Sequence, residues 1–143
     1  MQKRVLKYSE DLRDKLLSGV SQLSDAVKTT MGPRGKNVLI DIESGPPILT
    51  KDGVTVAEAI NLVDRFENLG AQVVKEAARQ TAEVAGDGTT TSTVLAQAIF
   101  EFGTKYLVSG GNIRDLRDSL KEAKLEAICL LYTSDAADEC LCV

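Results

Sequence analysis

The amino-acid sequence predicts a mainly α-helical domain that carries one β-hairpin, and three observations lead to this fold class. Apolar residues recur at the spacing of a helix face over most of the chain. Aromatic residues make up only 4% of the sequence, and Trp is absent. The core must therefore consist mostly of Ala, Val, Leu and Ile, which suits helices that pack closely through small side chains. At 143 residues the chain is long enough for one modest domain with its own core.

The first helix is predicted to start after Ser9, because Ser is a common N-cap residue. Its apolar face consists of five residues at helical spacing: Leu12, Leu16, Val20, Leu23 and Val27. We expect Gly32 and Pro33 to end this helix, since Gly permits a turn and the Pro ring cannot continue a helix.

A β-hairpin is predicted for residues 37–50. Residues 37–42 are rich in β-branched and aliphatic side chains, residues 43–47 have the Gly and Pro of a turn, and residues 48–50 return. A two-stranded hairpin is marginally stable alone and leaves its strand edges unpaired. We therefore expect it to pair with another segment, which can come from the same chain or from another subunit.

Two helical segments are predicted after the hairpin. Lys51-Asp52-Gly53 forms a polar turn, and a short helical stretch covers about residues 55–60. A longer helix runs from about residue 65 to 84. Its apolar positions are Phe66, Leu69, Val73, Val74 and Ala77, while Ala78 and Ala82 allow a close approach of a neighbouring helix.

Two more helices complete the chain. One is predicted for residues 89–108, and its buried side is expected to consist of Val94, Leu95, Ala98, Ile99, Phe102 and Leu107. Gly110 and Gly111 end it. The last helix starts after Asn112, an N-cap residue with an acid three positions on, and its apolar stripe is Leu116, Leu120, Ala123 and Ala127.

Composition excludes several classes of function. The formal net charge is −4 and the isoelectric point is near 4.9, which argues against a nucleic-acid partner. No apolar run is long enough to span a bilayer, and the first residues lack the apolar stretch of a secretory signal. We expect a cytoplasmic protein with no membrane partner. The three cysteines, Cys129, Cys140 and Cys142, are expected to be free thiols, because their number is odd and the chain has no His to complete a metal site.

The most informative motif is the run Gly86-Asp87-Gly88-Thr89-Thr90-Thr91, where a flexible loop leads directly into a helix. A helix N-terminus presents unpaired N–H groups and a partial positive charge, so it can hold a phosphate. Asp87 stands where a carboxylate could hold a phosphate-bound Mg²⁺. Spacing alone leaves a second interpretation equally open, namely a helix with polar Thr residues in its first turn. The motif is not a Walker A loop, since it lacks the Gly-Lys-Ser/Thr ending.

Two other glycine-containing turns could lie close to this motif in the folded chain. Residues 30–35 form a Gly-rich turn, and residues 51–53 place a cation beside an acid. Each of them taken alone indicates only a turn.

Taken together, these segments resemble the signature blocks of group I chaperonins, the GroEL family. The blocks occur in the order and spacing of that family, and the resemblance covers about residues 3–127. They are residues 30–38 (TMGPRGKNV), 50–57 (TKDGVTVA), 66–72 (FENLGAQ), 85–91 (AGDGTTT) and 94–97 (VLAQ). The resemblance implies the N-terminal part of the helical equatorial domain, which binds ATP and makes ring contacts.

The resemblance also implies a role for each matching residue, with ATP and Mg²⁺ as the cofactors. The nucleotide and its phosphates would be lined by Thr30, Met31, Gly32 and Pro33, where Met31 replaces the usual Leu of the family. Lys51 and Gly53 would lie on the phosphate side, and Asp52 would be an auxiliary catalytic acid near the γ-phosphate. Asp87 would be the Mg²⁺ ligand. The phosphate cradle would consist of Gly88, Thr89, Thr90 and Thr91.

The implied function is that of a ring-forming molecular chaperone, which assists folding by ATP-driven encapsulation of non-native polypeptides. The family forms homo-oligomeric double rings of seven subunits per ring, and it binds the co-chaperonin and unfolded polypeptides through domains absent here. The main catalytic acid of the family also lies further along the chain. We therefore expect the 143-residue chain alone to have weak or no ATPase activity. The alternative is a short non-catalytic interaction protein that joins or blocks a chaperonin ring.

The last residues do not resemble the family. Residues 1–128 are assigned to the N-terminal part of the equatorial ATP-binding domain, and residues 129–143 to a non-family tail. Residues 129–139 resemble the translation of a transposon-adaptor sequence used to prepare sequencing libraries. We expect that the gene continues in its own frame and that this tail is a sequencing or assembly artefact. A divergent natural tail is the alternative.

Overall fold

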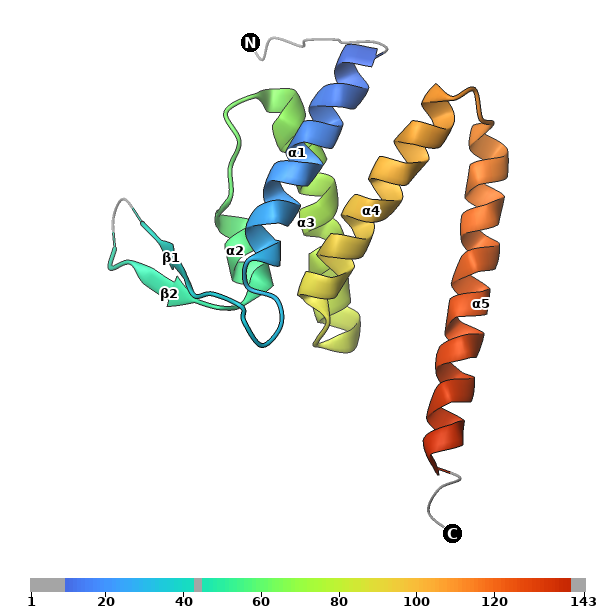
Figure 1. The fold of residues 1–143 in the computed structure, drawn as a ribbon. Coiled ribbons are helices and arrows are strands. Elements are labelled where there is room, and N and C mark those ends of the chain that lie inside the picture. Colours follow the sequence, from blue (N-terminus) through green and yellow to red (C-terminus); the bar gives the residue numbers. More distant parts are fainter. Residues whose placement is uncertain (1–9, 43–44, 140–143) are drawn as a thin grey trace. The chain divides into compact units, whose positions relative to one another are not determined.

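A computed structural model describes the backbone of residues 10–42 and 45–139, and side chains as far as residue 132. Its elements, in chain order, are α1 (Glu10–Lys28), β1 (Val38–Ile40), β2 (Ile48–Thr50), α2 (Gly53–Ala59), α3 (Arg65–Ala85), α4 (Thr89–Val108) and α5 (Ile113–Glu139). The two strands pair antiparallel, with Leu39 opposite Leu49 (Figure 1). The predicted fold class, mainly helical with one hairpin near residues 37–50, is confirmed. The chain divides into two compact units, residues 1–102 and 103–143.

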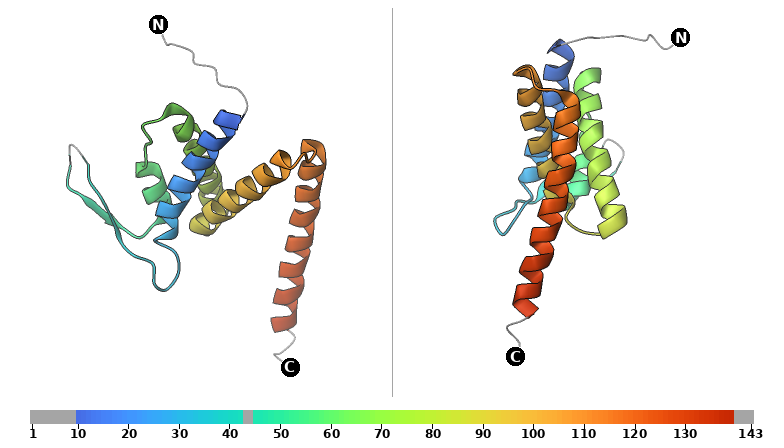
Figure 2. Two further views of the ribbon diagram at one scale, coloured as in Figure 1. Left: turned by 45° about the horizontal axis from the view of Figure 1, so that its top comes forward. Right: turned by 90° about the vertical axis from the view of Figure 1, so that its right-hand side faces the viewer.

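The core of the first unit lies between α1 and α3, with α2 packed against both. Helices α1 and α3 lie side by side and run in the same direction in every view (Figures 1 and 2). The buried apolar residues that form the central cluster come from all three helices: Val20, Leu23, Val27, Val56, Ala57, Ala71 and Val74. Three of the residues predicted for the apolar face of the first helix, Val20, Leu23 and Val27, are therefore confirmed as core residues.

The backbones of α1 and α3 touch directly at two glycines. A Cβ atom added at Gly19 would lie 2.6 Å from the carbonyl carbon of Glu67, and one added at Gly70 would lie 3.0 Å from that of Leu16. These are main-chain atoms, so no side-chain rotation could make room. Close approach was predicted at Ala78 and Ala82 instead; Ala78 is indeed buried, but the tightest contact depends on the two glycines.

Polar side chains flank this helix contact. Ser18 Oγ donates to one carboxylate oxygen of Glu67 at 3.1 Å, and Gln22 Nε2 donates to the other at 3.2 Å. Asp64 is the N-cap of α3, where it accepts from the N–H of Phe66 at 2.8 Å, and it also pairs with the ammonium of Lys15. The hydrogen bond from Lys15 and those from the backbone hold the pKa of Asp64 below its usual value. The polar contacts thus fix the start of α3 against α1.

The ends of two helices differ from the prediction by more than one residue. Helix α1 ends at Lys28, a few residues before Gly32-Pro33. After its end, the backbone N–H and the hydroxyl of Thr30 both donate to Val27 O, at 3.1 and 2.8 Å, and so satisfy a carbonyl of the last turn. Helix α2 begins at Gly53, two residues earlier than predicted, since Asp52 caps it. Helices α3 and α4 have the predicted bounds to within one residue. The predicted N-cap Ser9 lies outside the described residues.

The prediction of the buried side of α4 was wrong in part. The fully buried residues of α4 are Thr93 and Gln97, whereas Leu95 and Phe102 are 58% and 68% exposed. Ile99 is exposed as well, and Val94, Ala98 and Leu107 are half-buried. Thr93 can be buried because its hydroxyl donates to Thr89 O at 2.9 Å. The periodicity of the sequence located an apolar face of α4, but the structure buries a different face of this helix.

The predicted apolar faces of α3 and α5 are also exposed in part. Leu69 and Val73 were predicted as apolar-face residues of α3 and are exposed, while Val74 beside them is fully buried. In α5, Leu116 is half-buried, and Leu120, Ala123 and Ala127 are exposed. An apolar stripe in the sequence therefore marks a face suited to burial, and only a neighbouring element can bury it.

The second unit contains the end of α4, residues 103–108, and the whole of α5. The turn between them is tight: Gly110 has φ +93°, and Gly111 N donates to Tyr106 O at 3.0 Å. Asn112 accepts from the N–H of Arg114 at 3.0 Å, which confirms it as the predicted start of the last helix. Helix α5 continues across residue 128 to Glu139, so no helix end marks the boundary predicted there, and that boundary stays a prediction.

Within the described part of the chain, none of the helices combines the length and apolar character needed to cross a bilayer.

The core predicts a large effect for one leucine. Leu23→Ala, at a position with no solvent exposure, should lower the free energy of unfolding by about 3 kcal/mol, because it deletes buried methyl groups and leaves a cavity. Leu95→Ala, on the exposed face of α4, is the control and should cost less than about 0.5 kcal/mol. Urea unfolding of both variants measures the difference, and equal losses would contradict this assignment of the core.

Candidate functional site

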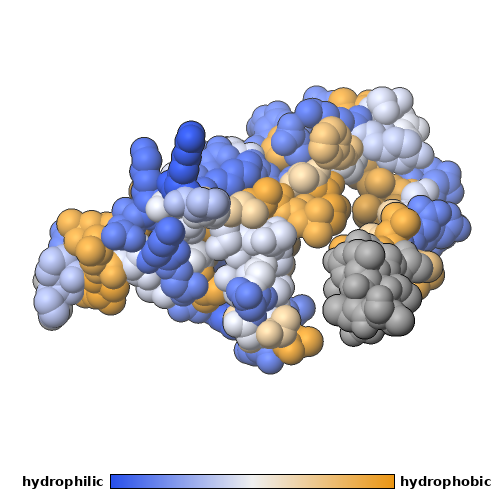
Figure 3. Space-filling model, turned by 60° about the horizontal axis from the view of Figure 1, so that its bottom comes forward, coloured by the Kyte–Doolittle hydropathy of each residue, from blue (hydrophilic) through white to orange (hydrophobic). Residues whose placement is uncertain are grey.

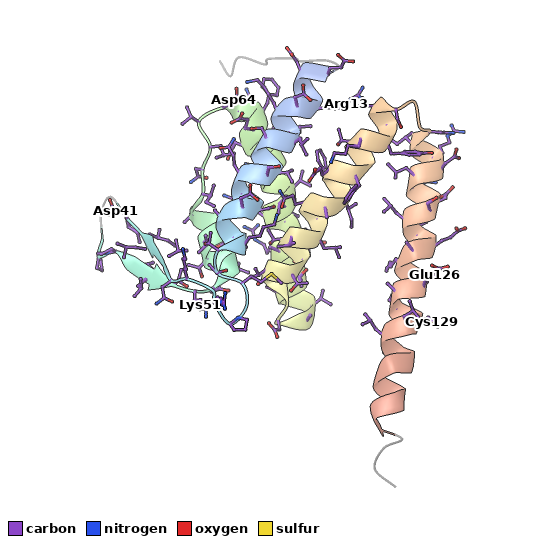
Figure 4. The ribbon with its side chains drawn as sticks, in the orientation of Figure 1. Arg13, Asp41, Lys51, Asp64, Glu126 and Cys129 are labelled. Atoms are coloured by element: carbon purple, nitrogen blue, oxygen red, sulfur yellow. The ribbon has the colours of Figure 1, made fainter. Side chains whose placement is uncertain are left out.

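The predicted site segments gather at one end of the first unit. The carboxyl ends of α1 and α3 and the amino end of α4 lie at the same end in each view (Figures 1 and 2). Lys51 lies there as well, next to the loop that follows α1, whereas Asp41 lies out on the hairpin (Figure 4). A helix N-terminus beside glycine turns is an arrangement that can bind a phosphate group.

The loop after α1 is closed by its own backbone. Gly35 N donates to Gly32 O at 3.0 Å, and Lys36 N donates to Thr29 O at 2.8 Å. Gly32 has φ +75°, a conformation that a side chain disfavours. Within this loop Thr30 is buried, while Met31 is 46% exposed and Pro33 is exposed. The loop is therefore fixed in shape and offers its outer residues to a ligand.

Lys51 lies directly against this loop. A Cβ atom at Gly35 would be 2.6 Å from the carbonyl carbon of Thr30 and 2.9 Å from Cε of Lys51. Only a residue without a side chain leaves that space for the lysine stem. The structure thus brings together two segments, residues 30–35 and 51–53, whose proximity the sequence does not specify. Gly35 was missed as a site residue, because its role depends on a contact that spacing does not reveal.

Asp52 has a structural task in addition to the catalytic one predicted for it. It is the N-cap of α2, and it accepts from Val54 N at 3.4 Å, Thr55 N at 2.9 Å and Thr55 Oγ1 at 2.6 Å. These hydrogen bonds, led by the one from the Thr55 hydroxyl, hold the pKa of Asp52 below its ordinary value of 3.8. Asp52 is therefore an ionised carboxylate of fixed orientation at neutral pH.

Gly53, at the start of α2, packs against the start of α4. A Cβ atom at this position would collide with Oγ1 of Thr90 and lie 3.3 Å from its Cβ, with Cγ1 of Val27 at 3.1 Å on the other side. Gly53 is fully buried as a result. This contact places the Lys51–Gly53 turn beside the first turn of α4.

The amino end of α4 follows two left-handed glycines. Gly86 and Gly88 have φ of +70° and +76°, and added Cβ atoms there would meet nothing within 4 Å. Asp87, which is exposed, accepts from Gly88 N at 2.7 Å. Gly88 O accepts from Ser92 N at 2.9 Å, so Gly88 stands at the N-cap position without a side chain that could occupy the first-turn N–H groups. Those groups remain available to a ligand, together with the hydroxyls of Thr89, Thr90 and Thr91.

The available carboxylates fit a Mg²⁺ ion that arrives with a phosphate. Within residues 10–42 and 45–132, no three His, Cys, Asp or Glu side chains cluster as a metal site. Mg²⁺ usually keeps several waters and is held by one or two carboxylates plus substrate phosphates, rather than by an all-protein cage. Asp87, at the amino end of α4, is a carboxylate of that kind.

The fold and the site define a helical domain in which two glycine-containing turns, residues 30–35 and 51–53, lie close to the amino end of α4. The family model of the TCP-1/cpn60 chaperonin family matches residues 23–140, and the chain belongs to this family. The chain is also similar to solved structures of the chaperonin gp146 from bacteriophage EL 2 (Pseudomonas aeruginosa), determined in the presence of ATP-BeFx. One crystal form matches with a TM-score of 0.64 and 36% identity over 69% of this chain, and another with 0.59 and 39% over 64%.

The chain spans only 18% and 17% of the length of those two chaperonin chains. Most of the phage chaperonin therefore has no counterpart in this chain.

The cap at Asp52 leads to a prediction that separates its two roles. Asp52→Ala should lower the free energy of unfolding by about 1 kcal/mol through loss of the N-cap, while Asp52→Ser, which can still cap α2, should cost less than about 0.5 kcal/mol. Both variants lack the carboxylate and should lose its electrostatic contribution at the candidate site equally. Urea unfolding and Mg·ATP binding of the two variants test this, and equal stability losses would contradict the capping role.

The same carboxylate makes stability depend on pH with a known sign. Because the folded-state pKa of Asp52 is lowered, its contribution is complete above the ordinary value of 3.8 and is lost as pH falls through the lower folded-state value. Asp52→Ser should therefore flatten the decline of stability below about pH 4 relative to the unmodified chain. An unchanged slope would show that other carboxylates account for the decline.

Proposed function

We propose that this chain is part of the ATP-binding portion of a ring-forming molecular chaperone subunit, which assists protein folding by ATP-driven encapsulation of non-native polypeptides. The observation that carries the proposal is the pair of contacts at one end of the helices. Lys51 lies against the loop of residues 30–35, and Gly53 packs on Thr90 at the start of α4. Three segments separate in the sequence thus border one place that can receive a polyphosphate.

The chemistry of each group at the candidate site indicates how it would bind the phosphates or the Mg²⁺ ion. The first-turn N–H groups of α4 and the hydroxyls of Thr89, Thr90 and Thr91 would bind phosphate oxygens. The Lys51 ammonium would neutralise phosphate charge, and Asp87 would hold the ion. Mg²⁺, when bound, supplies further neutralisation of the phosphates. The fixed carboxylate of Asp52 would lie near the γ-phosphate as an auxiliary acid.

The comparison with the phage chaperonin supports the cofactor assignment. That protein was solved in the presence of ATP-BeFx and shares 36% of its residues with this chain over the matched part. The contacts of Gly35 and Gly53 add geometric support, because they bring the loop of residues 30–35, Lys51 and the start of α4 close together.

Assembly into rings would use the hairpin. Leu39 and Leu49 are each 65% exposed and stand opposite one another in the ladder, beside exposed Ile42 and Ile48. Figure 3 shows apolar side chains at the left edge of the molecule, over the hairpin. Such a surface with free strand edges suits pairing with a neighbouring subunit. The double ring with seven subunits per ring, the co-chaperonin, the unfolded clients and the cytoplasmic location are part of the same proposal.

The test is to measure binding and turnover of nucleotide by the 143-residue chain. We expect saturable Mg·ATP binding by equilibrium dialysis, together with little or no steady-state hydrolysis, because the main catalytic acid is expected further along the chain. Absence of binding at millimolar nucleotide by a chain with its helices intact would contradict the ATP-binding proposal. Turnover comparable to that of an intact chaperonin subunit would contradict the proposed inactivity of the isolated chain.

A further inference from the structure

Helix α2 connects the candidate site to a cluster of charges on α3. It has only seven residues, about 10 Å of helix, and a helix this short is not stable without contacts at its ends and face. Its amino end carries Asp52 and Gly53, which belong to the site. Its inner face buries Val56 and Ala57 in the core. What holds its carboxyl end therefore influences where the site residues stand.

The carboxyl end of α2 is held by one lysine of α3. The ammonium of Lys75 donates to the carbonyl oxygen of Ile60, the C-cap residue, and to that of Glu58 at 3.3 Å. Carbonyl groups at a helix carboxyl end lack partners within the helix and carry partial negative charge, so a cation binds there favourably. Lys75 is partly buried, and this desolvation lowers its pKa, so its ammonium depends on these carbonyls to replace water.

Arg79, one turn further along α3, contacts α2 differently. It pairs with the carboxylate of Glu58 at 3.3 Å and with Glu76 at 3.7 Å, and all three side chains are about half exposed. Exposed ion pairs of this kind contribute little to stability. Arg79 thus binds a side chain of α2, whereas Lys75 binds its main chain.

We propose that Lys75 is a positioning residue for the nucleotide site: by binding the carboxyl-end carbonyls of α2 it fixes this helix along α3 and so sets where Asp52 and Gly53 stand against α4. The role in nucleotide binding rests on the proposed function, but the effect on α2 does not. A rigid two-turn helix transmits a shift at one end to the other, and Gly53 has no free space beside Thr90 to absorb it.

The experiment compares three variants of the full chain. Lys75→Met keeps the apolar stem and removes the donor, Lys75→Arg restores a cation, and Arg79→Met is the matched control on the same helix. Amide hydrogen exchange of Val56 and Ala57 reports on α2, and Mg·ATP affinity reports on the site. For Lys75→Met we expect at least about tenfold faster exchange and about tenfold weaker binding, because both charge-assisted hydrogen bonds to the end of α2 are lost. Lys75→Arg should recover most of both, and Arg79→Met should change each less than about twofold.

The possible results distinguish failure of the proposed function from failure of the positioning role of Lys75. If the unmodified chain does not bind Mg·ATP, the proposed function fails, and the exchange of Val56 and Ala57 alone decides whether Lys75 fixes α2. If Lys75→Met binds nucleotide as tightly as the unmodified chain, or leaves the exchange of α2 unchanged, the positioning role is wrong. If Lys75→Met does not fold, Lys75→Gln, which keeps a neutral donor, replaces it, and the same two comparisons with Arg79→Met apply.

Discussion

Replacing Gly19 by Ala is expected to lower the free energy of unfolding by about 3 kcal/mol, near the upper end for overpacking. The new Cβ would lie 2.6 Å from the carbonyl carbon and 2.9 Å from the Cα of Glu67, so α1 and α3 would have to separate along the core. Gly70→Ala meets the main chain of Leu16 and should behave alike. The loss occurs even though Ala is intrinsically the better helix former, by about 1 kcal/mol.

The matched control is Gly103→Ala, another glycine inside a helix. Its added Cβ would lie 3.4 Å from Cδ2 of Leu116, an ordinary contact, so helix propensity should dominate and stability should hold or rise by up to about 1 kcal/mol. Urea unfolding followed by circular dichroism measures all three variants. A Gly19→Ala protein as stable as Gly103→Ala would mean that α1 and α3 do not touch through their backbones.

Asp87→Asn is expected to weaken Mg·ATP binding at least about tenfold while leaving Mg-free ATP binding nearly unchanged. The substitution removes the negative charge that would hold Mg²⁺, yet its side-chain oxygen can still accept from Gly88 N, as Asp87 does at 2.7 Å. The loop should therefore keep its shape. Titrations with ATP in the presence of Mg²⁺, and again with a chelator, separate the two effects.

Glu83→Gln is the control for this charge change, because Glu83 is an exposed carboxylate in the last turn of α3. It should leave both titrations unchanged. If Asp87→Asn weakened binding equally with and without Mg²⁺, Asp87 would act on the loop and not on the metal.

Much of the fold could be predicted from the sequence, because its signals are local. The glycines at residues 86 and 88 separate α3 from α4, and the cap at Asn112 starts α5 where expected. The hairpin follows from β-branched residues on both sides of a Gly-Pro-Pro turn. Such signals act within a few residues, so spacing alone reveals them.

The contacts between elements could not be predicted in the same way. Nothing near Gly19 or Gly70 in the sequence indicates that each meets the other helix's backbone. The buried Thr93 and exposed Leu95 of α4 reverse the expectation from hydrophobicity, since packing depends on which neighbour is present. Lys75 was missed for a similar reason: its partners are main-chain carbonyls, which leave no mark in the sequence.

For the candidate site, the sequence indicated the segments, and the structure adds how they meet. The glycine turns and the Thr run suggested phosphate binding, but the same pattern also fitted a helix start with polar residues. Lys51 lies beside Gly35 and Thr90 lies beside Gly53, which is the proximity that the ligand interpretation needs. Asp52 combines a cap with an ionised carboxylate, and only the coordinates reveal the cap.

The most direct test of the central claim, that three segments share one nucleotide, follows the glycine amides of the chain by NMR during a titration with Mg·ATP. We predict that the signals of Gly32, Gly53 and Gly88 shift together with one dissociation constant. Gly45 in the hairpin turn and Gly110 before α5 should not move. Shifts that saturate at different concentrations, or that appear at Gly110 and not at Gly53 and Gly88, would contradict the shared site.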